Sequence, residues 1–219
     1  MPSKPDSASG KKRAGKIFSL LKKEYPVPKP ALNYHTAFQL LISTILSAQC
    51  TDARVNIVTK GLFKKYKTPQ DYIDVSSGEL EKDIYSTGFY RQKAKSIKLC
   101  CLKLVEKYRG KVPADFDKLN KLHGVGRKTA SVVAGNAFGI PSIAVDTHVK
   151  RLSNLLGFIN SGDPVKIEMK LKELLPEKDW INSSHWLMSH GRKICIARKP
   201  KCLQCMIGNF CPSFNPENK

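Results

Sequence analysis

Four cysteines stand close together near the end of the chain. Their order is C-x6-C-x2-C-x5-C within seventeen residues, at Cys195, Cys202, Cys205 and Cys211. Four thiolates at this spacing can enclose one metal centre. Zinc sites of the ribbon kind place two C-x2-C pairs about 15 to 20 residues apart, whereas this run holds one such pair. A 4Fe-4S cluster, which takes four cysteine thiolates, suits the spacing better, with zinc and a chance grouping as the alternatives.

The cysteine run is surrounded by bases. Arg198, Lys199 and Lys201 lie between its first two cysteines, and Arg192 and Lys193 come just before it. No acid occurs between residues 180 and 216. Arg198 and Lys199 are therefore expected to dock on DNA phosphates. The alternative is a set of ordinary solvated side chains.

The other three cysteines, Cys50, Cys100 and Cys101, lie in helical apolar patterns. A free cysteine in such a pattern is most often a small buried hydrophobic residue. They are expected to pack in a core and not to bind the metal.

A glycine turn between two helical patterns forms a second chemical feature, in the segment Leu-His-Gly-Val-Gly-Arg-Lys-Thr-Ala at residues 122–130. Glycines at Gly124 and Gly126 permit a tight turn and expose amide groups beside a helix N-terminus, where a DNA phosphate can bind. The backbone from Gly124 through Val125 and Gly126 to Arg127 is the expected clamp. Taken alone, such a turn is also typical of a simple connector.

Three segments resemble the endonuclease III family of DNA glycosylases. The glycine turn resembles that family's helix-hairpin-helix, the segment Ile-Ala-Val-Asp-Thr-His at 143–148 its catalytic-aspartate segment, and the cysteine run its cluster loop. The segment Leu-Ser-Ala-Gln-Cys-Thr-Asp at 46–52 agrees as well, and the likeness covers about residues 30 to 212 in consistent order.

The resemblance implies that Lys128 is the nucleophile and Asp146 its carboxylate partner. An amine that attacks C1′ of the sugar displaces the damaged base and leaves a Schiff base, from which β-elimination breaks the strand 3′ to the lesion. An ionised Asp146 would stabilise the developing sugar cation and assist proton transfers. From the residues alone, Lys128 is one more solvated lysine, and Asp146 caps a helix that begins at Thr147.

The target nucleotide must leave the duplex stack, so side chains are needed to fill the gap. The resemblance implies Gln49 for this role and Phe89 as an apolar wedge. The alternatives are a buried Gln at a helix end and a core Phe. His123 departs from the family, which has proline before the glycines, and receives no role.

The elements that must position these residues all read as helices. Thr51 can cap a helix that carries an apolar stripe, Asp163 followed by Pro164 starts another, and Gly191 is placed to end the helix through Trp186. No strand alternation competes, so the predicted class is all-α.

The resemblance implies the helix-hairpin-helix DNA glycosylase fold, with a lesion-binding cleft between two modules. A six-helix module with the hairpin spans residues 30–140. A second helical module with the iron-sulfur loop combines residues 16–29 with 141–219. Residues 1–15, which lack apolar periodicity, are expected to be a disordered basic arm.

The balance of 38 Lys and Arg against 18 Asp and Glu gives a net charge of +20, which favours a polyanionic partner such as nucleic acid. The longest apolar stretch, near residues 38–46, is too short and too interrupted for a membrane span. No apolar run occurs before Ile17, so a secretory signal is not expected, and a weak organellar presequence is the alternative. The seven cysteines are therefore expected in a reducing, intracellular compartment that contains the DNA, the cytoplasm or nucleoid if the source is prokaryotic.

The predicted function is base-excision repair, in which a monomeric DNA glycosylase and abasic-site lyase removes oxidised or damaged pyrimidines from double-stranded DNA. Mismatch adenine glycosylases lack a lysine at position 128, and oxoguanine glycosylases lack the cluster cysteines. A non-catalytic iron-sulfur DNA-binding regulator is the alternative from another class. The pair of Lys128 and Asp146 argues against it.

Overall fold

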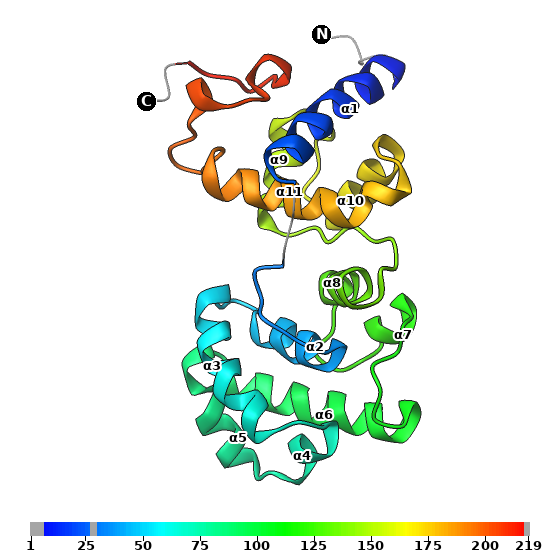
Figure 1. Ribbon diagram of the computed structural model, residues 1–219, viewed down its shortest axis with the longest axis vertical. Coiled ribbons are helices and arrows are strands. Elements are labelled where there is room, and N and C mark those ends of the chain that lie inside the picture. Colours follow the sequence, from blue (N-terminus) through cyan, green and yellow to red (C-terminus); the bar gives the residue numbers. More distant parts are fainter. Residues whose placement is uncertain (1–6, 27–29, 217–219) are drawn as a thin grey trace. The chain divides into compact units, whose positions relative to one another are not determined.

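The computed structural model describes residues 7–26 and 30–216. These residues form helices and loops without a β-strand, as predicted (Figure 1). The α-helices are α1 (Ser7–Glu24), α2 (Ala37–Leu46), α3 (Asp52–Lys65), α4 (Pro69–Asp74), α5 (Ser77–Ile84), α6 (Tyr90–Tyr108), α7 (Phe116–Asn120), α8 (Arg127–Phe138), α9 (Thr147–Leu155), α10 (Pro164–Leu174) and α11 (Trp180–Lys193). Short 3-10 helices are η1 (Tyr85–Thr87), η2 (Glu177–Asp179), η3 (Cys202–Gln204) and η4 (Gly208–Phe210).

The described chain divides into two compact units, each with its own apolar core. Unit 2 is the continuous segment Pro30–Ile140. Unit 1 combines the described residues of Met1–Lys29 with those of Pro141–Lys219. Unit 2 thus contains the glycine turn and unit 1 the cysteine run.

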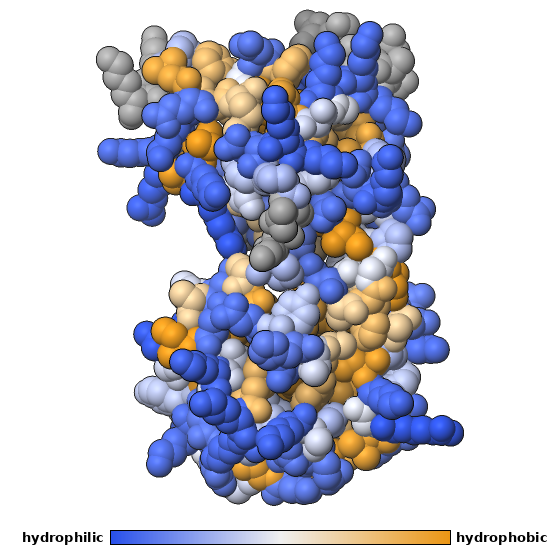
Figure 2. Space-filling view, in the orientation of Figure 1, coloured by the Kyte–Doolittle hydropathy of each residue, from blue (hydrophilic) through white to orange (hydrophobic). Residues whose placement is uncertain are grey.

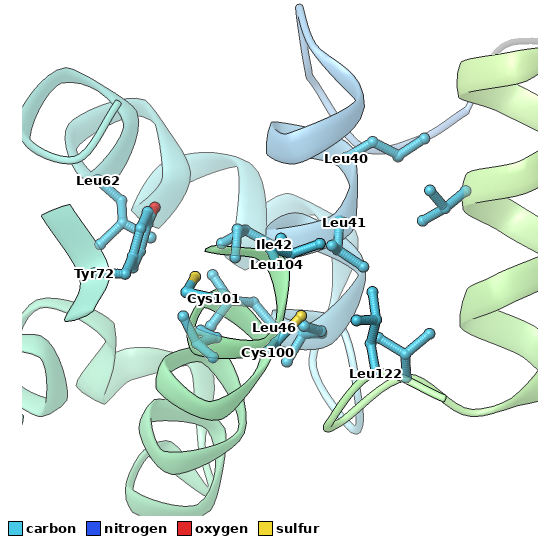
Figure 3. Close-up of a cluster of buried hydrophobic side chains, with 14 of the residues drawn as sticks. Leu40, Leu41, Ile42, Leu46, Leu62, Tyr72, Cys100, Cys101, Leu104 and Leu122 are labelled. Carbon is cyan, nitrogen blue, oxygen red and sulfur yellow. The ribbon is translucent and has the colours of Figure 1, made fainter. Parts of the chain in front are cut away.

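Unit 2 is built around α2 and α6. Helix α2 buries each residue from Leu40 to Leu46, and α4 and α5 pack along α6. Figure 3 shows Cys100 and Cys101 of α6 among aliphatic side chains of this core, where both are fully buried. Cys50 is half-buried against the same core. The expectation of buried packing residues is confirmed for Cys100 and Cys101, whereas Cys50 follows α2 in a turn and is only partly buried.

Three lysines of α6 bind the ends of neighbouring elements. Their Nζ atoms donate to main-chain oxygens as follows: Lys93 to Leu46 and Thr87, Lys98 to Tyr72, Ile73 and Val75, and Lys103 to Lys121. The last carbonyls of a helix carry partial negative charge, so an ammonium group placed there is stabilising. These lysines link α6 to the ends of α2, η1, α4 and α7.

The N-terminal part of the chain is helical earlier than expected. Helix α1 begins at Ser7, so the assignment of residues 1–15 to a disordered arm is wrong for residues 7–15, while residues 1–6 lie outside the described part. Ala14, Ile17 and Leu21 are fully buried at helical spacing against α10 and α11. The apolar stripe therefore starts before Ile17, and tertiary packing extends the helix over a basic, Gly-containing sequence.

Helix boundaries in unit 1 agree with the sequence at one point and differ at another. Asp163 caps α10 and Pro164 is its first residue, as predicted. Gly191 does not end a helix, because α11 continues to Lys193. A Cβ atom at Gly191 would lie 2.9 Å from Nδ1 of His148, so this glycine lets α9 approach α11 closely.

Long hydrophilic side chains project from both units on the face drawn in Figure 2. Among the described helices, none is long and apolar enough to cross a membrane.

Candidate functional site

The glycine turn lies between α7 and α8 in unit 2. Gly124 has a φ of 73°, in the left-handed region that favours glycine. A Cβ atom there would lie 2.8 Å from Cβ of Ser96 in α6 and 3.6 Å from Cγ2 of Ile45 in α2. The Val125 side chain is buried, and its N–H donates to the Leu122 carbonyl at 3.2 Å. Packing inside unit 2 alone therefore requires glycine at position 124.

Gly126 differs from Gly124, since the protein itself does not require it. Gly126 is the N-cap residue of α8, with extended backbone and no capping side chain. A Cβ atom at this position would meet no atom within 4 Å. The first N–H groups of α8 thus face an open approach, where a phosphate oxygen can accept them without obstruction.

Lys128 is the second residue of α8, in its first turn, and its side chain is exposed. Its neighbour Arg127 is also exposed, with its guanidinium 5.3 Å from the centre of the Phe116 ring. Lys128 is accessible to a substrate that binds at the N-terminus of α8.

Asp146 belongs to unit 1, where it is the N-cap of α9. Its Oδ1 accepts the N–H of Val149 at 2.8 Å, so the expectation that it caps this helix is confirmed. The cap fixes the half-buried carboxylate and uses one of its two oxygens.

Gln49 and Phe89 share an unusual backbone conformation. Their φ values are 52° and 48°, and these left-handed conformations cost about 1–2 kcal/mol each for a residue other than glycine. Gln49 is exposed after α2, and Phe89 is 66% exposed directly before α6. The alternatives of a buried Gln and a core Phe are therefore wrong. Both side chains are presented to solvent from tight turns of unit 2.

The four cysteines of the run surround one cavity of about 290 Å³ in unit 1. Its other walls come mainly from α9, α11 and the two loops that carry the cysteines. In the described residues, no group of three or more Cys, His, Asp or Glu side chains is arranged to bind a single metal ion. Four thiols that line one cavity are a donor set that a metal centre could use.

Hydrogen bonds reach the cysteine sulfurs from the surrounding protein. Nη1 of Arg151 donates to Sγ of Cys195 at 3.5 Å, and Nε2 of His190 lies 3.5 Å from Sγ of Cys205. Burial, together with the positive charge of Arg151, lowers the pKa of His190 to about 4, so this ring is neutral near pH 7. Such contacts orient metal ligands and tune the centre they hold.

Two of the four thiols are costly to ionise without a metal. Burial raises the pKa of Cys205 and of Cys211, and the neighbouring cysteines add to the shift. Hydrogen bonds from the N–H of Ile207 to Cys205 and from the N–H of Ser213 to Cys211 act in the opposite direction and offset part of this rise. A metal centre would supply the positive charge that the thiolates need.

The basic residues of this loop are on the surface. Arg198, Lys199 and Lys201 are exposed between α11 and η3, and Arg192 and Lys193 are exposed at the end of α11. Their exposure agrees with docking on phosphates and with ordinary solvation.

Two positioning residues were missed from the sequence. Arg13 of α1 donates to the carbonyls of Leu156 and Phe210 at 2.7 and 2.9 Å, and so links the first helix to the cysteine loop. Lys93 is buried in unit 2. A signal for Lys93 existed, because it precedes Ile97 by four residues on the apolar stripe of α6. For Arg13 the sequence carries no comparable signal.

The fold and these sites define a class of protein. The family model of the HhH-GPD superfamily base excision DNA repair protein matches residues 42–177. This range includes the Gln49 turn, the hairpin with Lys128, and Asp146.

Individual relatives narrow the class. The endonuclease III of Synechocystis sp. is 49% identical over 207 residues, which cover 94% of each chain. A solved non-covalent endonuclease III-DNA complex has a TM-score of 0.90 and 46% identity, covering 93% of this chain and 95% of that one. A trapped endonuclease III-DNA covalent intermediate, with an estranged adenine, gives the same score and identity over 93% and 96%. The chain belongs to the endonuclease III family. It is a base-excision DNA glycosylase that is also an abasic-site lyase.

Proposed function

We propose that Lys128 is the nucleophile of this glycosylase and lyase. The observation that carries the proposal is the exposed amine in the first turn of α8, directly after an uncapped glycine hairpin. The amine attacks C1′ of the damaged nucleotide, the bond from C1′ to the base breaks, and the resulting iminium links Lys128 to the sugar. A relative trapped as a covalent intermediate with DNA supports this chemistry.

Asp146 supplies the opposing charge. As an ionised carboxylate facing the same sugar, it stabilises the oxocarbenium-like transition state and assists the proton transfers that precede β-elimination. The α9 cap supports this role, because the hydrogen bond from the N–H of Val149 fixes the carboxylate in place.

Gln49 and Phe89 open the duplex. They enter the stack, fill the space of the extruded nucleotide and support the orphaned partner base. Their exposure on strained turns supports this assignment, as does the estranged adenine of the solved relative. The amide groups around Gly124, Val125, Gly126 and Arg127 hold a phosphate beside the lesion, and Arg198 and Lys199 dock the cysteine loop on the backbone.

Cys195, Cys202, Cys205 and Cys211 would hold a 4Fe-4S cluster. The shared cavity and the sulfur-directed hydrogen bonds support this ligand set. When bound, the cluster would supply four metal-thiolate links that brace the basic loop, and the base-excision steps use protein groups alone.

The proposed substrates are oxidised or saturated pyrimidines in double-stranded DNA, and the proposed location is the compartment that contains the genome. The chain is proposed to act as a monomer, since each of the assigned roles is filled by residues of a single chain.

Borohydride trapping tests the nucleophile. Sodium borohydride should reduce the Schiff base between Lys128 and an abasic sugar and leave an irreversible protein-DNA adduct. Lys128→Gln should abolish the adduct, because the attacking amine is removed. Duplex binding should survive, because the hairpin clamp uses backbone amides and the substitution removes only one positive charge. Denaturing electrophoresis and binding titration measure the two effects.

A Lys128→Gln protein that still traps at the native rate would move the nucleophile to another amine. A native protein that binds abasic DNA but forms no adduct would favour the non-catalytic DNA-binding protein.

A further inference from the structure

Lys93 is a buried lysine with no part in the proposed chemistry. Its side chain is 5% exposed, within the core of unit 2, at a point where α6 faces α2 and η1. The Nζ atom donates to the Leu46 carbonyl and to the Thr87 carbonyl, both at 2.8 Å. A buried ammonium is stable only with such partners, and both carbonyls stand at the negative ends of helical segments.

Both acceptors lead directly into the turns that present the proposed DNA-probing residues. Leu46 is the last residue of α2, and the next turn carries Gln49. Thr87 is the last residue of η1, and Phe89 follows after one glycine. The backbone N–H of Lys93 also donates to the Phe89 carbonyl at 3.0 Å. One residue therefore binds the base of both turns.

The two turns need support of this kind. Gln49 and Phe89 hold left-handed backbone without being glycine, and such conformations persist where the surrounding structure over-determines them. Charged hydrogen bonds to Leu46 and Thr87 fix where each turn begins and how far apart the two turns stand.

We propose that Lys93 is a positioning residue that holds the Gln49 and Phe89 turns at a fixed separation before DNA binds. Base opening then needs no rearrangement of the probing side chains, and the binding free energy is spent on unstacking the duplex. This inference rests on the proposed roles of Gln49 and Phe89.

Helix α6 offers a matched control. Lys98 lies five residues after Lys93 in the same helix. Its Nζ atom also donates to carbonyls, those of Tyr72, Ile73 and Val75 at the end of α4. Neither probing turn follows α4. Lys98→Met thus removes the same type of bond from the same helix and leaves both turns in place.

The experiment compares Lys93→Met, Lys98→Met and Phe89→Ala in the full-length protein. One duplex carries 2-aminopurine opposite a tetrahydrofuran abasic analogue, so fluorescence reports unstacking of the orphan base. A second duplex carries dihydrouracil, and base release is followed in single turnovers. A third carries a preformed abasic site for borohydride trapping. Thermal unfolding of each variant reports the loss of folding stability.

Lys93→Met should lose most of the fluorescence rise and release the base at least about tenfold more slowly, because small displacements of positioned groups cost large factors in rate. Trapping on the preformed abasic site, where no base must leave the stack, should stay within about threefold of native. Lys98→Met should lower the unfolding temperature similarly and keep native fluorescence and base release.

Equal defects in Lys93→Met and Lys98→Met, or native base release in Lys93→Met, would overturn the proposal. If Phe89→Ala keeps the full fluorescence rise, the wedge role of Phe89 fails and this inference fails with it. If Phe89→Ala shows a defect and Lys93→Met does not, the positioning role of Lys93 is wrong and the wedge role of Phe89 stands. If Lys93→Met does not fold, Lys93→Gln is compared with Lys98→Gln and the same criteria apply. Glutamine keeps a hydrogen-bond donor on a shorter side chain.

Discussion

One carboxylate oxygen of Asp146 accepts the N–H of Val149 in the first turn of α9, so this residue serves the helix as well as the proposed reaction. Asparagine caps a helix about as well as aspartate. A single substitution can therefore separate the charge from the cap, which is rarely possible for a residue with two roles.

We expect Asp146→Asn to slow base release by about 10²–10³-fold, because the charge opposing the sugar cation is lost. Trapping on a preformed abasic site should persist, since the amine of Lys128 remains. Single-turnover base release and borohydride trapping measure the two. Asp146→Ala, the control for the cap, should in addition lower the free energy of unfolding by about 1 kcal/mol. Native base release in Asp146→Asn would exclude a charge role.

At the residue scale, the spacing of the cysteines predicts that they gather, but the sequence does not predict the residues that support the sites. Cysteine spacing alone pointed to one metal centre, and four thiols do share a cavity. Only the resemblance predicted that Phe89 is exposed, because an aromatic residue in an apolar pattern usually lies in the core. Arg13 and Lys93 were missed, because long cationic side chains are expected at the surface and their partners are carbonyls distant in sequence.

At the scale of elements, the hairpin contains two glycines that lie in different surroundings. Gly124 is held by left-handed backbone and by the nearby Cβ of Ser96. Gly126 faces open space at the N-terminus of α8. The two glycines cannot be told apart from the sequence. Only the packing of the turn against α2 and α6 shows that position 124 requires glycine and position 126 does not.

Alanine at these positions should give opposite results. Gly124→Ala should destabilise unit 2 by about 1–3 kcal/mol through strain and overpacking, with duplex affinity reduced only as folding is lost. Gly126→Ala should fold with near-native stability but bind duplex DNA more weakly, because the added methyl group stands where a phosphate would approach. Thermal unfolding and a binding titration separate the two. A Gly126→Ala protein with native affinity would remove this turn from the DNA interface.

The cysteine loop is the second element with a direct test. The purified protein should be brown, and Cys202→Ser should lose iron and lower the unfolding temperature, because one of four ligands to the centre is removed. Cys50→Ala is the matched control, since Cys50 packs against the core of unit 2, and its iron content should stay native. Visible absorbance and metal analysis after anaerobic preparation decide. Colourless native protein with stoichiometric zinc would overturn the cluster assignment.

Helix ends illustrate what local sequence can and cannot fix. Asp163 and Thr51 start helices as predicted, because a cap is a contact between near neighbours in the chain. Gly191 lies inside α11, and α1 starts at Ser7, because contacts from other helices decide both. Close approach of His148 requires the glycine, and burial of Ala14 extends the first helix.

At the scale of the whole molecule, the charge of +20 governs association with DNA. Each phosphate neutralised releases about 0.9 counterion, so affinity should fall steeply with salt. Lys199→Ala should reduce the slope of log affinity against log salt by about one. Lys170→Ala is the matched control, because Lys170 on α10 pairs with Glu173 at 2.9 Å and its loss should leave the slope unchanged. Affinity for undamaged duplex that does not vary with salt would contradict electrostatic docking.

The link from Arg13 to Leu156 and Phe210 has a consequence for how the protein is made. Unit 2 is one continuous segment and can fold while the ribosome is still working, whereas α1 packs on α10 and α11 and must remain undocked until they emerge. At about 5–20 residues per second, this delay lasts on the order of ten seconds or more. The nascent helix spends that interval with Ile17 and Leu21 uncovered, because the helices that bury them have not yet been made.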